Sequence, residues 1–137
     1  MSAVCLLVET CAEDWIEDKE TLIDSFYAVE GFTNPTKHKE VVAAILESNY
    51  DMWVLKWLSE NTQADQKLHP SLRIIGNLAE GSEEVCVRLV KGGVLNVLEG
   101  TLHSRHSRAK QDAVWTLSNI ASSSRNNYIR ESILSNV

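Results

Sequence analysis

The sequence predicts an all-α protein, a solenoid of stacked helical repeats, and three observations support this. The apolar residues of the 137-residue chain recur at the three- and four-residue spacing of amphipathic helices. Only two prolines and six glycines are present, too few for a loop-rich β protein. One segment also recurs: 71–79 reads SLRIIGNLA, and 113–121, which begins 42 residues later, reads AVWTLSNIA. A period in the low forties is typical of two- and three-helix solenoid repeats.

The clearest repeat spans residues 82–123 and contains three predicted helices. The segment 83–91 is apolar on one side, and Gly92-Gly93 should end it because glycine accepts a left-handed backbone. A second helix follows over 94–102 and a third over 108–121, both with apolar residues at helical spacing.

A divergent repeat over residues 35–81 precedes it, with helices expected over 40–46, 52–58 and 68–79. Ser48-Asn49 stands where the glycine pair stands in the next repeat, and Pro70 should either kink the third helix or mark its effective start. Partial repeats flank this pair at 1–31, with helices over 2–11 and 21–30, and at 124–137, with a helix from 132.

Each repeat buries its apolar stripe only against its neighbours, so both ends should expose apolar surface. The candidates are residues 5–8 at one end and Ile129, Ile133 and Leu134 at the other. Either the chain is a piece of a longer solenoid or these ends pair with something, and self-association is expected.

Charge and composition argue against nucleic-acid and membrane partners. The net charge is −6, and the closest approach to a basic cluster, formed by Arg105, Arg108 and Lys110, is interpreted as a solvated helix start. The apolar run 3–8 is too short for a membrane span or a signal peptide. An odd set of cysteines (Cys5, Cys11 and Cys86) without metal-like spacing is interpreted as core residues in a reducing compartment, which indicates a cytoplasmic or nuclear protein.

Enzyme signatures are missing from the sequence. It contains no glycine-rich phosphate loop, nucleophile elbow or clustered Cys/His pair, so we expect no catalytic residues and no cofactor. His103 and His106 have metal-like spacing but no third ligand nearby, so no metal site is expected.

One face of the 108–121 helix carries a candidate binding site. Asp112, Trp115 and Asn119 are spaced by three and four residues and therefore share that face. An asparagine amide can bond both groups of a peptide unit, and an indole face attracts a cation by about 0.5–2 kcal/mol. Arg73 and Asn77 form the same i, i+4 pair one repeat earlier. Glu83 and Asp112 would complete a pocket for a cation.

These motifs resemble the armadillo repeats of the importin-α (karyopherin-α) family, closest to the C-terminal half of that solenoid. The matching patterns are Asp112-Ala-Val-Trp115-x-x-x-Asn119 and Pro70-Ser-Leu-Arg73-x-x-x-Asn77, with Gly81-Ser82-Glu83 at the position of a lysine pocket. The resemblance implies a right-handed α-solenoid in which an asparagine ladder holds an extended basic peptide and tryptophans sandwich its lysine stems.

The chain departs from the family pattern in three places. Ile23 and Tyr27 stand where the preceding repeat would carry its Trp and Asn, no acid closely follows Asn119, and no basic N-terminal arm is present.

Alternatives remain open for the aromatic and amide residues. Trp115 could be a core residue, and Asn77 and Asn119 could satisfy main-chain groups between adjacent helices. Trp53 and Trp57 are expected to pack in the core.

The sequence therefore predicts a non-enzymatic adaptor segment that holds a basic, nuclear-localisation-type peptide. The alternative is a structural scaffold that joins proteins through its convex face or open ends. An accessory domain of an enzyme is a third, weaker interpretation.

Overall fold

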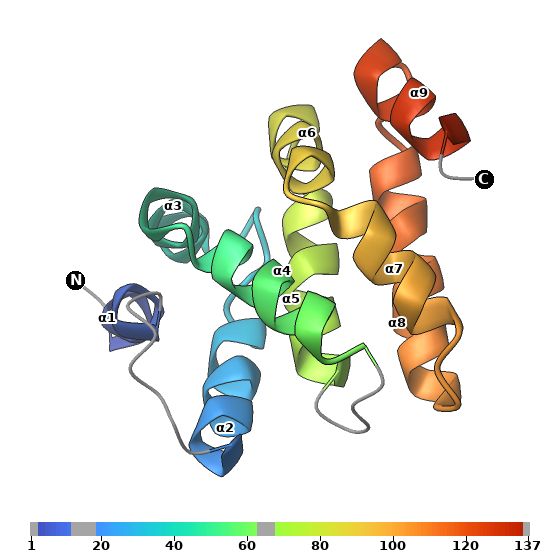
Figure 1. The fold of residues 1–137 in the computed structure, drawn as a ribbon. Helices are drawn as coiled ribbons and strands as arrows, with labels where there is room; N and C mark the ends of the chain where they lie inside the picture. The colour runs from blue at the N-terminus through green and yellow to red at the C-terminus, as the bar shows by residue number, and fades with distance from the viewer. Residues whose placement is uncertain (1–2, 12–18, 63–67, 136–137) are drawn as a thin grey trace.

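The computed structural model describes residues 3–11, 19–62 and 68–135, and all regular elements in these ranges are α-helices. The prediction of an all-α protein is confirmed for these residues (Figure 1). None of the described helices is long and apolar enough to cross a membrane. The helices are α1 (Ala3–Cys11), α2 (Lys19–Glu30), α3 (Lys39–Ser48), α4 (Tyr50–Glu60), α5 (Leu68–Ala79), α6 (Glu83–Lys91), α7 (Val94–Leu102), α8 (Ser107–Ala121) and α9 (Asn127–Ser135).

Two groups of three helices, α3–α5 and α6–α8, follow one another along the chain. Figure 1 shows α3, α6 and α9 along the upper edge, with α5 behind α4, α8 behind α7, and α2 at the lower left. The longest helices are neighbours, because α5 contacts both α2 and α8. Each group thus presents its third helix to the third helix of the group before it.

Left-handed residues separate the first two helices of each group. Gly93, between α6 and α7, has φ 95°, and Asn49, between α3 and α4, has φ 60°. Asn49 is the one non-glycine residue with positive φ in the described ranges, and asparagine tolerates this conformation better than other side chains. The prediction that Asn49 replaces the glycine turn is confirmed.

The ends of three helices follow from local chemistry. Pro70 is the third residue of α5, where a main-chain N–H has no helical partner, so this proline lies in the first turn and breaks no helical bond. The last helix begins at Asn127, earlier than the expected 132, because Asn126 Oδ1 accepts a hydrogen bond from Ile129 N at 3.2 Å. Ser82 caps α6 in the same way through Val85 N at 3.1 Å.

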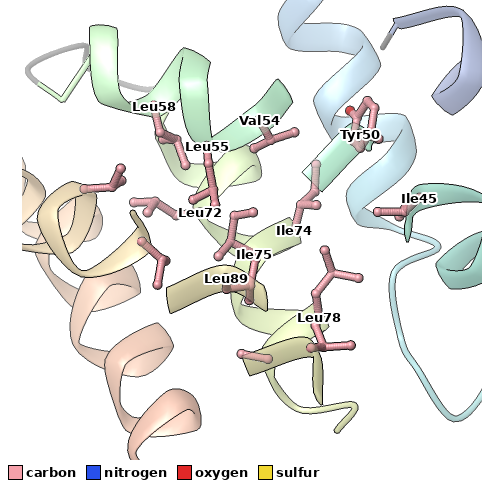
Figure 2. Packing of buried hydrophobic residues seen from close by; sticks show 14 of the residues in the cluster. Ile45, Tyr50, Val54, Leu55, Leu58, Leu72, Ile74, Ile75, Leu78 and Leu89 are labelled. Atoms are coloured by element: carbon pink, nitrogen blue, oxygen red, sulfur yellow. The ribbon is translucent and has the colours of Figure 1, made fainter. Parts of the chain in front are cut away.

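The hydrophobic core runs continuously through both groups. Figure 2 shows residues of α4 and α5 packed together, among them Leu55, Leu58, Leu72 and Ile75. Cys5 and Cys86 are buried as expected, and the side chain of Cys11 lies outside the described residues.

Trp53 and Trp57 are partly buried against this core. Their ring centroids lie 5.7 and 5.0 Å from that of Phe26, in α2. The prediction that both tryptophans serve packing is confirmed.

An ion pair between a buried carboxylate and a partly exposed guanidinium ties the second group to the first. Asp51, at the start of α4, is fully buried, and Arg88 of α6 approaches it with Nε 2.5 Å from Oδ2 and Nη2 2.9 Å from Oδ1. Nη2 also donates to Asn49 Oδ1 at 2.8 Å. The hydrogen bond with Asp51 raises the pKa of Arg88, so the guanidinium stays charged.

Candidate functional site

The candidate site lies where α8 packs along α5. Asp112, Trp115 and Asn119 all contact α5, as their shared helix face requires. Together with Arg73 and Asn77 of α5 they form what we call the α5–α8 face.

Trp115 is half-buried and packs on α5 at two points. Its ring centroid lies 4.3 Å from the Cζ of Arg73, a cation–π contact within the chain. A Cβ atom at Gly76 would lie only 2.1 Å from Trp115 Cζ3, so the ring fits here because position 76 has no side chain. Trp115 therefore belongs partly to the interface between the two helices, and part of it reaches the surface.

Arg73 links Trp115 to α2 as well. Its Nε lies 3.6 Å from Glu30 Oε1, and both side chains of this pair are about one-third exposed. A carboxylate, a guanidinium and an indole thus follow one another across α2, α5 and α8. Solvent weakens this ion pair, so it positions Arg73 more than it stabilises the fold.

The two asparagines both donate to the helical layer before their own. Asn119 Nδ2 donates to Gly76 O at 3.0 Å, and Asn77 Nδ2 donates to Thr33 Oγ1 at 2.8 Å. The main-chain role that the sequence left open is therefore present for Asn119, whereas Asn77 bonds a side-chain hydroxyl in the loop after α2. The Oδ1 atoms of Asn77 and Asn119 accept no hydrogen bond from other residues in the described ranges, so each retains an acceptor for a ligand.

Asp112 is buried, with 7% exposure, and is paired inside the protein. Its Oδ2 lies 2.5 Å from Nδ1 of His69, at the start of α5. Glu83 is exposed at the start of α6, and its Oε1 accepts from Asn126 Nδ2 at 2.6 Å. The two acids lie toward opposite ends of α8, so they do not form one cation pocket.

The position of α2 corrects the expected alignment of the first partial repeat. Arg73 contacts Glu30 and Asn77 contacts Thr33, so Glu30 and Thr33 lie at the levels assigned to Ile23 and Tyr27. The echo between 29–31 and 79–81 suggested a different register. It misled because α2 ends at Glu30, whereas residues 31–37 continue beside the end of α5, where a Cβ at Gly81 would touch Pro35.

Several residues of this region were not singled out from the sequence. Glu30, Thr33 and His69 each contact a predicted site residue that lies 43 or 44 positions later. That separation is close to the 42-residue repeat, so the repeat itself contained the signal. Adding one or two residues to the offset would have identified these partners.

Comparison with known proteins gives no match, either to a family model or to a curated protein. The roles of Arg73, Trp115 and Asn119 are therefore inferred from their contacts and their exposure.

Proposed function

We propose that the chain is a segment of a right-handed armadillo-type solenoid that binds an extended polypeptide and catalyses no reaction. Two successive three-helix groups support this architecture, because their third helices pack together. In both groups a left-handed residue also connects the first helix to the second. The 42-residue sequence repeat coincides with these groups. In such solenoids the aligned third helices form an extended binding surface.

The observation that carries the proposal is the pairing of Trp115 with Asn119 on the α5–α8 face. Asn119 is anchored by its Nδ2 bond to Gly76 O, which leaves Oδ1 to accept a peptide N–H. Part of the indole surface next to it remains available for the aliphatic stem of a lysine or arginine. The amide binds a main chain without reading its side chains, and the aromatic surface adds a preference for a long cationic side chain.

The preferred ligand in this proposal is a basic peptide of the nuclear-localisation type. The net charge of −6 attracts cationic ligands, and the Trp/Asn pattern resembles that of importin-α repeats. Because Arg73 already stacks on Trp115, a ligand cation packs on the remaining exposed part of the ring. The corresponding location is the cytoplasm and the nucleus.

A fluorescence-anisotropy titration with a Lys/Arg-rich peptide at low salt tests this proposal. Trp115→Ala and Asn119→Ala should each weaken binding by about 1–2 kcal/mol, which is roughly five- to thirtyfold. Asp112→Asn should have a smaller effect, because His69 already contacts that carboxylate. Binding should weaken as salt is added.

Trp57→Ala is the matched control, because Trp57 packs against Phe26 in the core. It should lower the melting temperature, and any loss of binding should follow the loss of folded protein. If Trp115→Ala binds the peptide as tightly as the parent, the adaptor proposal is wrong.

A second candidate function is a scaffold that joins proteins through its ends. Val114, Tyr128 and Leu134 on the last two helices are 57%, 44% and 65% exposed, and Leu6 at the other end is 59% exposed. Val8 and Ile129, which the sequence placed on the open ends, are instead buried, as is Cys5, for which the sequence allowed both a core and an end position. Self-association in light scattering, together with no affinity for the basic peptide, would favour the scaffold.

A further inference from the structure

A cavity opens where α2, α5 and the beginning of α8 meet. Its volume is about 500 Å³, far more than a single small ion occupies. It lies at the N-terminal ends of α5 and α8 and is not needed for peptide binding at Trp115. The residues that line it are Tyr27, His69, Arg105, His106, Ser107, Arg108 and Ala109.

The lining is basic although the chain as a whole is acidic. Two arginines, Arg105 and Arg108, and two histidines, His69 and His106, contribute to it, whereas the net charge is −6. Arg105 forms no ion pair or hydrogen bond with any other residue that the structure describes, so its guanidinium is available to a ligand. Asp112, an acid that contacts this group, is already paired with His69.

A chain of contacts holds Arg108 at the wall of the cavity. Nδ1 of His69 lies 2.5 Å from Asp112 Oδ2 and 3.2 Å from Arg108 Nε. Nε2 of the same ring lies 2.9 Å from Arg108 Nη2. This carboxylate–imidazole–guanidinium chain fixes one side of Arg108 and leaves its Nη1 group for other partners.

The first turn of α8 adds main-chain donors to the same wall. Ser107, Arg108 and Ala109 begin this 15-residue helix and line the cavity. Their N–H groups donate to no other described residue, and the His106 side chain does not cap them. These donors and the positive end of the helix dipole add to the field of the side chains.

We infer that this cavity binds the phosphate group of a phosphoserine or phosphothreonine side chain in a partner polypeptide. A phosphate monoester offers oxygens to several donors at once, and arginine recognises it by paired hydrogen bonds. The space beyond the cationic wall accommodates the residue that carries the phosphate. Since Trp115 and Asn119 take no part, this site is independent of the basic-peptide site.

The test compares two peptides that differ only in the phosphorylation of one serine and contain no Lys or Arg. At low salt the phosphopeptide should bind the full chain about tenfold more tightly than its unmodified partner. Arg105→Ala should remove this advantage, and Arg105 has no partner within the described chain to lose, so melting should be unchanged. Arg105→Ala should also leave the affinity for the basic peptide unchanged, which separates the two proposals.

Lys110→Ala is the matched control. This exposed residue follows Ala109 in the first turn of α8, close to the cavity, but does not line it. It should change phosphopeptide affinity less than twofold if the wall, and not the general charge, recognises the phosphate. Equal loss in Lys110→Ala and Arg105→Ala overturns the inference, as does equal affinity for both peptides. Inorganic phosphate that competes as well as the phosphopeptide, or a single-stranded oligonucleotide that binds more tightly, also overturns it.

Discussion

The two three-helix groups have the same order of helices but hold their third helices in different ways. In the second group α8 contacts α5 through side chains, at Arg73 and His69, and also through main-chain features, with Trp115 over Gly76 and Asn119 bonded to Gly76 O. In the first group α5 meets the preceding layer through side chains, with Arg73 on Glu30 and Asn77 on Thr33. A main-chain anchor tolerates change in the neighbouring side chain more easily than a side-chain pair does. The contact of α5 with the layer before it therefore depends more on the identity of its side chains than the contact of α8 with α5 does.

The turns differ in a parallel way. Gly93 has a left-handed backbone, and a Cβ added there would meet no atom within 4 Å, whereas the Oδ1 of the left-handed Asn49 is bonded to Arg88. The divergent first group is thus tied down by the second, through Arg88 to Asp51 and Asn49. Loss of regular repeat features in one group is offset by polar contacts with the next.

The largest effect on the contact between the two groups is expected for Arg88→Ala. Removal of the guanidinium leaves the fully buried carboxylate of Asp51 without its partner, which should lower the free energy of unfolding by about 3 kcal/mol. Glu84→Ala, an exposed change on the same helix, should have little effect. Chemical denaturation measures both.

The double variant Arg88→Met, Asp51→Asn sharpens the same point, because it removes both charges together. It should recover much of the loss seen in Arg88→Ala. If the single variant is as stable as the parent, the ion pair does not tie the two groups together.

The second largest effect is expected for Gly76→Ala, which changes the residue on which Trp115 and Asn119 of α8 pack. The new Cβ would lie 2.1 Å from Trp115 Cζ3 and 2.8 Å from Thr116 Oγ1, so the indole must leave Arg73 or α8 must move. We expect a loss of about 1–3 kcal/mol by thermal or chemical unfolding. Gly31→Ala, where the nearest atom is 3.8 Å away, is the control and should be nearly neutral.

Sequence periodicity was sufficient for the helices of the second group. The expected segments 83–91 and 94–102 coincide with α6 and α7, because their glycines and apolar stripes act locally. The start of α9 was missed because a single side-chain cap, Asn126, begins that helix earlier than its apolar residues indicate. Local rules identify helices well, but a cap acts through one hydrogen bond that periodicity does not reveal.

The candidate site was predicted only in part, for a different physical reason. The i, i+4 spacing placed Asp112, Trp115 and Asn119 on one face, and the structure agrees. Their partners could not be deduced from one helix, since they depend on how far adjacent helices are displaced along their axes. The paired separations of 43 and 44 residues record that displacement, and the buried pairing of Asp112 with His69 follows from it.

A smaller effect is expected for Gly93→Ala, which tests the left-handed turn of the second group. No atom lies within 4 Å of the new Cβ, so the change reports only the backbone strain at φ 95°. The free energy of unfolding should fall by about 1 kcal/mol. Gly93→Asn should cost less, because asparagine occupies the equivalent turn at position 49. Equal costs for both variants would show that side-chain type does not decide this turn.

The smallest effect concerns Cys86, which joins the two groups and is sensitive to high pH. Its Sγ–H donates to Ala79 O at 3.2 Å, and burial raises the pKa of the thiol above its ordinary value of 9.0. Above about pH 9 the unfolded chain loses this proton while the folded chain keeps it, so the stability should fall as the pH rises. Below that pH the thiol is protonated in both states and contributes no slope.

Denaturation of the parent and of Cys86→Ala between pH 8 and pH 10 isolates this contribution, since lysines and tyrosines titrate in both proteins. The parent should lose stability more steeply than the variant over this interval. At pH 8 the variant should be the less stable of the two, because it lacks the bond to Ala79 O and leaves a small void. Parallel pH profiles would mean that the thiol meets water in the folded protein and that the junction between the groups is looser than its burial indicates.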